Sequence, residues 1–130
     1  MKQNKYLVIG GAFIFLAVAL GAFGAHGLKN ILDVKALATF KTGVTYQMYN
    51  GIGILLVSLI AKVFQVDFSR SLNFMIIGIV LFSFNCYLYA LTQIKTIAMI
   101  IPFGGMCFLI AWFLFSFKAY KELNQKEREL

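Results

Sequence analysis

His26 is the only histidine of the chain, and it lies where a long apolar segment ends, in the run Leu-Gly-Ala-Phe-Gly-Ala-His-Gly-Leu-Lys of residues 20–29. An imidazole there can titrate near neutral pH, and so relay a proton or bind a metal. A zinc site needs several ligands, however, and no carboxylate or thiolate directly neighbours His26. We therefore expect neither a metal site nor a cofactor, and we favour a structural, hydrogen-bonded histidine over a proton relay.

Three amide side chains lie inside apolar segments: Gln47, Asn50 and Asn85. An amide that faces lipid is costly, so these side chains should point into a helix bundle. Their positions along the segments place all three amides in the same half of the membrane as His26. We therefore predict that the four residues form one polar cluster. The cluster is expected to join helices, with a hydrated site for protons or a small solute as the alternative. One helical face of the second segment carries Gly43, Gln47, Asn50, Gly51, Ile54 and Ser58.

Enzyme chemistry has little support in this sequence. The serines lack a plausible base, because the only histidine lies at another depth from most of them. No pair of carboxylates lies within the apolar segments, so paired acid–base catalysis is not expected there. The glycine-rich runs follow no predicted strand, so they do not indicate a phosphate-binding loop. We predict that the protein is not an enzyme.

The elements that must position these residues are four apolar segments, at residues 6–25, 43–63, 72–91 and 97–117. Of the 130 residues, 61% are apolar and 13% are charged. Each segment has about 20 residues, which as a helix crosses a hydrocarbon layer about 30 Å thick. We predict an all-α protein, with residues 1–130 forming a single domain of four transmembrane helices. The first segment resembles a signal peptide, but its length and the three segments after it favour a retained helix.

The net charge of +7 comes from basic residues spread over the segment ends, which favours a membrane topology over binding to nucleic acid. Cytoplasmic loops of membrane proteins carry an excess of lysine and arginine. We therefore predict a multi-pass membrane protein with both termini in the cytoplasm. This orientation places inside eight of the twelve basic residues, Lys2, Lys5, Lys62, Arg70, Lys118, Lys121, Lys126 and Arg128, and outside Lys29, Lys35, Lys41 and Lys95.

Small residues recur along the first segment at Ala17, Gly21, Gly24 and Ala25. Such spacing lets two helices approach closely in lipid, where packing drives association. We predict that this face packs against another helix, and it weakly favours a homo-oligomer. The alternative is that these residues have no specific packing role, because glycine is common in membrane helices in general.

In the fourth segment, Pro102 removes a backbone hydrogen bond, and Gly104 and Gly105 follow it. We predict a kink there. Trp112 lies too deep for an interfacial aromatic residue, so we expect it to pack between helices.

The link between the first two segments has a helix stop and a helix start. Gly27 can end the first helix in a left-handed conformation, and Asp33 is a good N-cap for a helix that begins at Val34. This helix is predicted either to lie at the membrane surface as a short interfacial helix or to be the start of the second transmembrane helix.

Several motifs in order along the chain resemble the domain-of-unknown-function 423 family of small membrane proteins. They are residues 21–28 (Gly-Ala-Phe-Gly-Ala-His-Gly-Leu), Phe40, Thr42-Gly43, Tyr46-Gln47, Leu81-Phe82-Ser83, Tyr87, residues 102–105 (Pro-Phe-Gly-Gly) and Trp112. The resemblance implies a four-helix protein of the bacterial cytoplasmic membrane, and it implies no assigned activity. Family members often have histidine at the position of Asn50 and Gly-Ser at that of Phe84-Asn85, so a role that needs two histidines is not expected here.

These observations together predict a non-enzymatic structural or interaction component of the membrane. Its expected partners are membrane lipid and either a second copy or another membrane protein. A small transporter or channel for protons or a small solute, built on the polar cluster, is the alternative.

Overall fold

The computed structural model describes the backbone of residues 2–130 and the side chains of residues 4–130. The described residues form helices and no strand: α1 (Lys2–His26), α2 (Val34–Phe64), α3 (Ser69–Gly78), the π-helix η1 (Ile79–Phe84), α4 (Asn85–Thr92) and α5 (Lys95–Arg128). Because α3, η1 and α4 are continuous, four helical segments are long and apolar enough to cross a membrane. The all-α fold with four candidate transmembrane helices is therefore confirmed.

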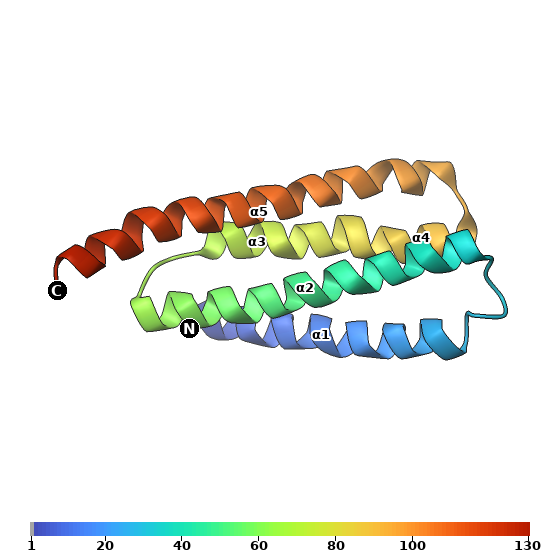
Figure 1. Cartoon of the computed structure of the whole chain (residues 1–130), viewed down its shortest axis with the longest axis horizontal. Coiled ribbons are helices and arrows are strands. Elements are labelled where there is room, and N and C mark those ends of the chain that lie inside the picture. Colours follow the sequence, from blue (N-terminus) through green and yellow to red (C-terminus); the bar gives the residue numbers. More distant parts are fainter. Residues whose placement is uncertain (1) are drawn as a thin grey trace.

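The four segments lie side by side and alternate in direction, so both chain termini lie at one end of the bundle (Figure 1). The α2–α3 link lies at this same end, and the α1–α2 and α4–α5 links lie at the other. We call these the terminal end and the loop end. α5 extends beyond the other helices at the terminal end.

The helix that begins at Val34 is part of the second transmembrane segment. Asp33 caps it as expected, because its Oδ1 accepts a hydrogen bond of 2.7 Å from the Ala36 amide. α2 then continues without a break to Phe64, so the predicted alternative of a separate interfacial helix was wrong. Ala36 and Phe40 are buried on the same stripe as the residues that follow them, and this tertiary packing explains the continuation.

The end of α1 does not use a left-handed glycine. No glycine in the described part of the chain has a positive φ, so the role expected for Gly27 was wrong. The chain turns where the Leu28 amide donates to the Phe23 carbonyl at 3.2 Å, and Leu28 is then buried. The left-handed residues are Gln65 after α2 and Gln93 after α4.

The small residues of α1 pack mainly against α2. Ala17 is completely buried, and a Cβ added to Gly24 would lie 2.9 Å from the Phe40 ring. Gly21 faces Val44 at 3.3 Å by the same measure, whereas Ala25 is exposed. The face that the sequence offered for association is thus largely covered within the chain.

The π-helix changes which face of the third segment is buried. A π-helix holds more residues per turn than an α-helix, so it shifts the residues after it around the axis. Regular α-helical spacing predicts one face with Ser71, Gly78, Phe82, Asn85 and Tyr89 on it, but only Ser71 and Gly78, which lie before η1, are buried. From Ser83 in η1 onward the buried positions lie one residue later, at Ser83, Cys86 and Ala90, with Tyr87 also buried.

α5 remains one helix through Pro102, whose side chain is exposed. Two residues after Pro102, α5 lies very close to η1: a Cβ added to Gly104 would lie 2.3 Å from the Phe82 amide nitrogen. Gly105 has space, because its nearest neighbour by the same measure is 3.8 Å away. Gly104 therefore lets α5 contact the π-helix backbone, and Pro102 does not interrupt the helix.

Candidate functional site

Gln47 joins three helices from the middle of the bundle. Its side chain is fully buried on α2, and its Nε2 donates to the Phe13 carbonyl of α1 at 2.8 Å. Its Oε1 accepts a hydrogen bond of 2.6 Å from the Tyr87 hydroxyl of α4. The Tyr87 ring packs on Phe40, with 4.8 Å between the ring centroids. Both ends of the amide are thus bound directly by protein.

Asn50 joins α2 to α5. It is 3% exposed, and its Oδ1 accepts a hydrogen bond of 3.0 Å from the Trp112 indole nitrogen. Its Nδ2 donates to the Tyr46 carbonyl within α2 at 2.9 Å. A Cβ on Gly53 would lie 2.6 Å from the Trp112 ring, so the indole lies directly against α2. The packing of Trp112 between helices is confirmed.

Asn85 has only local partners. It is half-buried, and its Nδ2 donates to the Leu81 carbonyl at 2.9 Å and to the Val80 carbonyl at 3.2 Å. Both acceptors belong to η1, where the wide turn weakens the regular pattern of backbone hydrogen bonds. The side chain therefore supports the π-helix from its own segment.

His26 lies apart from these hydrogen bonds. It is the last residue of α1, and its side chain is exposed and makes no hydrogen bond with the described residues. No hydrogen bond joins any two of His26, Gln47, Asn50 and Asn85 within the part of the chain that the structure describes. Instead of the single cluster predicted from the sequence, the structure has two separate interhelical links from α2, one at Gln47 and one at Asn50.

The partners of these links were not among the predicted site residues. Tyr87 and Trp112 supply the two donors, and the Phe13 carbonyl supplies an acceptor that no side-chain pattern can indicate. A buried tyrosine or tryptophan usually hydrogen-bonds its polar atom. That rule was the available signal that Tyr87 and Trp112 each need an acceptor, but it does not identify the acceptor.

Ser83 is the exception in the middle of the bundle. Its side chain is completely buried in η1, and its Oγ is the buried side-chain oxygen or nitrogen without a partner among the described residues. The Ser83 carbonyl lies 3.0 Å from where a Cβ of Gly43 would be, so η1 closely approaches α2 here.

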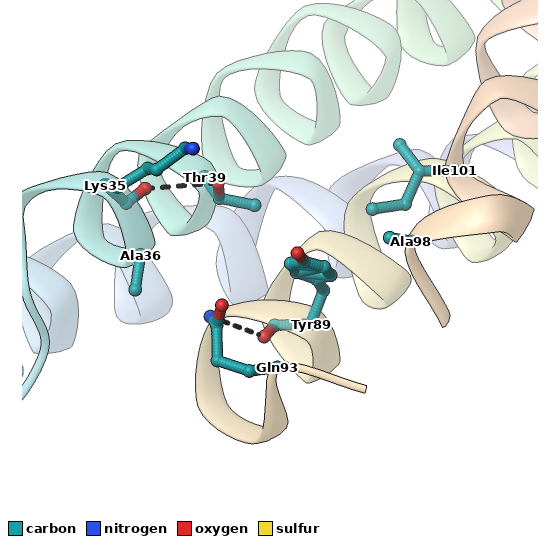
Figure 2. A pocket seen from close by; sticks show the side chains of 7 residues that line it. All are labelled: Lys35, Ala36, Thr39, Tyr89, Gln93, Ala98 and Ile101. Atoms are coloured by element: carbon teal, nitrogen blue, oxygen red, sulfur yellow. Dashed lines mark hydrogen bonds between the residues drawn. The ribbon is translucent and has the colours of Figure 1, made fainter. Parts of the chain in front are cut away.

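A pocket of about 280 Å³ opens at the loop end of the bundle. Figure 2 shows α2 and α5 on two sides of it, with the last turn of α4 below. Its polar groups come from Lys35, Thr39, Tyr89 and Gln93. Thr39 donates to the Lys35 carbonyl, and Gln93 donates to the Tyr89 carbonyl, so each of these two side chains binds its own helix. The Lys35 ammonium and the Tyr89 hydroxyl are the other two polar side-chain groups of the lining.

Metal-binding geometry was searched among the described residues, and no group of three or more histidine, cysteine, aspartate or glutamate side chains close enough to hold an ion was found. Both cysteines, Cys86 and Cys107, are free thiols.

Comparison with known proteins gives the family. Residues 20–105 match the family described as "Protein of unknown function (DUF423)". The chain belongs to this family. It is 42% identical to a UPF0382 membrane protein of Haemophilus influenzae over 119 residues, which cover 92% of this chain and 96% of the relative.

Two further relatives have the same description. A UPF0382 membrane protein of Staphylococcus saprophyticus is 37% identical over 92% of this chain and 99% of its own length. One from Bacillus subtilis is 38% identical over 93% of this chain and 100% of its own length. No solved structure matches the chain. The resemblance to the 423 family is confirmed, and the chain is a membrane protein of a family without an assigned activity.

Proposed function

We propose that this protein is a non-enzymatic component of the bacterial cytoplasmic membrane, which acts by packing with lipid, with a second copy or with another membrane protein. The observation that carries the proposal is the direct pairing of Gln47 and Asn50. Both amides lie in the middle of the bundle, and both bind side chains of other helices at 2.6–3.0 Å. Interhelical hydrogen bonds of this kind hold membrane helices together.

The transporter alternative needs polar side chains that face a hydrated space. Neither Gln47 nor Asn50 lines any of the four pockets described, which lie toward the two ends of the bundle. Transport sites are often lined by discontinuous helices. α5 is one continuous helix within the described residues. These features favour the structural role over transport.

Proton flux into proteoliposomes tests the proposal. The purified chain is reconstituted with a pH-sensitive dye inside the vesicles, and a pH step is applied. We expect vesicles with the natural chain to show the same proton flux as protein-free vesicles. Tyr87→Phe should lower the unfolding temperature of the protein and leave the flux unchanged. Flux above the protein-free level that Tyr87→Phe abolishes while the variant remains folded would contradict the structural role. Swelling of the same vesicles in small sugars and amino acids extends the test to solutes.

The orientation belongs to the same proposal. Both termini lie at one end of the bundle, and the excess of basic residues favours the cytoplasm for that end. A fluorescent protein fused to the C-terminus should fluoresce in cells, and alkaline phosphatase at the same position should be inactive. Active phosphatase would reverse the orientation.

A further inference from the structure

A second pocket, of about 440 Å³, opens at the terminal end of the bundle, between the start of α3 and the last third of α5. Three basic side chains line it: Arg70 from α3, and Lys118 and Lys121 from α5. The same lining holds two carboxylates, Asp67 and Glu122, so the basic side chains exceed the acidic ones by one. The two helices thus bring three cations to one hollow.

The α5 side of this pocket changes from apolar to basic along the helix axis. Lys118 lies four residues after Leu114, and Lys121 lies four residues after Phe117, so all four residues share one face. Leu114 and Phe117 belong to the apolar segment that ends at residue 117, and Phe117 is 60% exposed. The lysines begin directly after that segment. The face therefore crosses from the hydrocarbon layer into the headgroup region.

The geometry points to a binding site for one anionic phospholipid, whose phosphate would lie among Arg70, Lys118 and Lys121 and whose acyl chain would run along Leu114 and Phe117. Basic residues near the membrane surface attract anionic headgroups. Arginine and lysine are also the side chains that bind phosphate oxygens most directly. Because the site combines cations with an adjoining apolar face, a lipid fits it better than free phosphate. The inference is independent of the proposed structural role, since a transporter could hold the same lipid.

Two carboxylates on the pocket wall set the headgroup preference. Asp67 already accepts a hydrogen bond of 2.9 Å from the Ser69 amide, and it also accepts one from the Ser69 hydroxyl. Glu122 follows Lys121 on α5. Carboxylates would accept hydrogen bonds from the hydroxyls of a glycerol headgroup. Phosphatidylglycerol offers both the net negative charge and these hydroxyls, so we choose it as the probe.

The test compares the full chain, purified in a neutral detergent, with two triple variants. R70Q/K118Q/K121Q removes the three cations of the pocket. The matched control, K35Q/K41Q/K95Q, removes three cations from the loop end of the bundle. Affinity is measured by titrating phosphatidylglycerol, with phosphatidylcholine of the same acyl chains as the neutral lipid, and by following the unfolding temperature.

We expect phosphatidylglycerol to raise the unfolding temperature of the natural chain and of the control, and phosphatidylcholine to have less effect. The pocket variant should bind phosphatidylglycerol on the order of a hundredfold more weakly, since each basic residue near a membrane surface contributes about fivefold. Equal losses in the pocket variant and the control would show general attraction to charge and overturn the site. Equal binding of both lipids would also overturn it.

Two further measurements keep the result decisive. If the triple pocket variant does not fold, K121Q alone serves, because Lys121 is exposed and its loss should weaken binding about fivefold. Inorganic phosphate is added as a competitor in a parallel titration. If millimolar phosphate stabilises the chain as well as the lipid does, the pocket binds soluble phosphate and the lipid proposal fails. Unchanged affinity in K121Q with the triple variant unfolded would likewise reject it.

Discussion

Polar side chains in the middle of the bundle have different surroundings from those at its two ends. In the middle, Gln47 and Asn50 are bound directly by side chains of neighbouring helices. At the ends, Lys35 at the loop end and Lys118 at the terminal end line open pockets. Hydrocarbon offers a buried polar group no water, so the middle must satisfy its own groups, whereas headgroups and water are available at the ends.

This difference shows where recognition can be expected in so small a membrane protein. A polar residue that is already paired holds the helices together but has no capacity left for a ligand. A polar residue at a helix end costs little to leave unpaired, so it remains available for lipid, solute or another protein. Variants that compare paired with unpaired positions test this division.

The largest effect is expected where the middle is packed most closely. Gly104→Ala would place a Cβ 2.3 Å from the Phe82 amide nitrogen, and only a shift of α5 or of η1 can relieve that overlap. We expect a loss of about 2–3 kcal/mol in the free energy of unfolding. Gly105→Ala is the matched control, because its Cβ would meet nothing closer than 3.8 Å. Unfolding in detergent measures both, and equal stability of the two variants would contradict the close contact.

The next effect concerns the pairing of Gln47. Tyr87→Phe removes the hydroxyl and leaves the buried Gln47 Oε1 without its donor, which should cost about 1–2 kcal/mol. Tyr89→Phe, two residues along α4, is the control, because this hydroxyl faces the pocket at the loop end. In a double-mutant cycle, Gln47→Leu combined with Tyr87→Phe should give a coupling energy of about 0.6–1.7 kcal/mol. A coupling of zero would mean that the pair contributes nothing to stability.

A smaller effect of the opposite sign is expected at Ser83. Its buried hydroxyl has no partner among the described residues, so Ser83→Ala removes an unsatisfied group and should stabilise the protein by up to about 1 kcal/mol. Ser58→Ala is the control, because the buried Ser58 hydroxyl donates to the Ile54 carbonyl and its loss should be neutral or slightly destabilising. A loss of stability in Ser83→Ala greater than in Ser58→Ala would show that Ser83 has a partner in the membrane.

Much of the fold follows from the sequence because hydrophobic length and helical period are local signals. The four segments were predicted from apolar runs, and the buried face of α2 through Gly43, Gln47 and Ser58 was predicted from spacing alone and is confirmed. The Asp33 cap is equally local. In each case the deciding residues lie within one or two turns of one another.

The failures depend on information from other segments. No residue in Ile79–Phe84 signals a π-helix, so the predicted face of the third segment was displaced by one residue after it. Asn85 therefore binds η1 carbonyls, and Tyr87 takes the place facing Gln47. The polar pairs could not be predicted because residue depth alone does not fix the rotation of each helix about its axis.

His26 gives the smallest predicted effect and the strictest test of the division between the middle and the ends. The sequence predicts a hydrogen-bonded structural histidine, yet its side chain is exposed at the last residue of α1 and makes no hydrogen bond with the described residues. His26→Ala should therefore change the free energy of unfolding by less than about 0.5 kcal/mol, the usual range for an exposed side chain without partners. Unfolding of this variant beside Tyr87→Phe measures the contrast. A loss as large as that of Tyr87→Phe would mean that His26 is paired in the membrane and that the loop end, like the middle, is held by hydrogen bonds between helices.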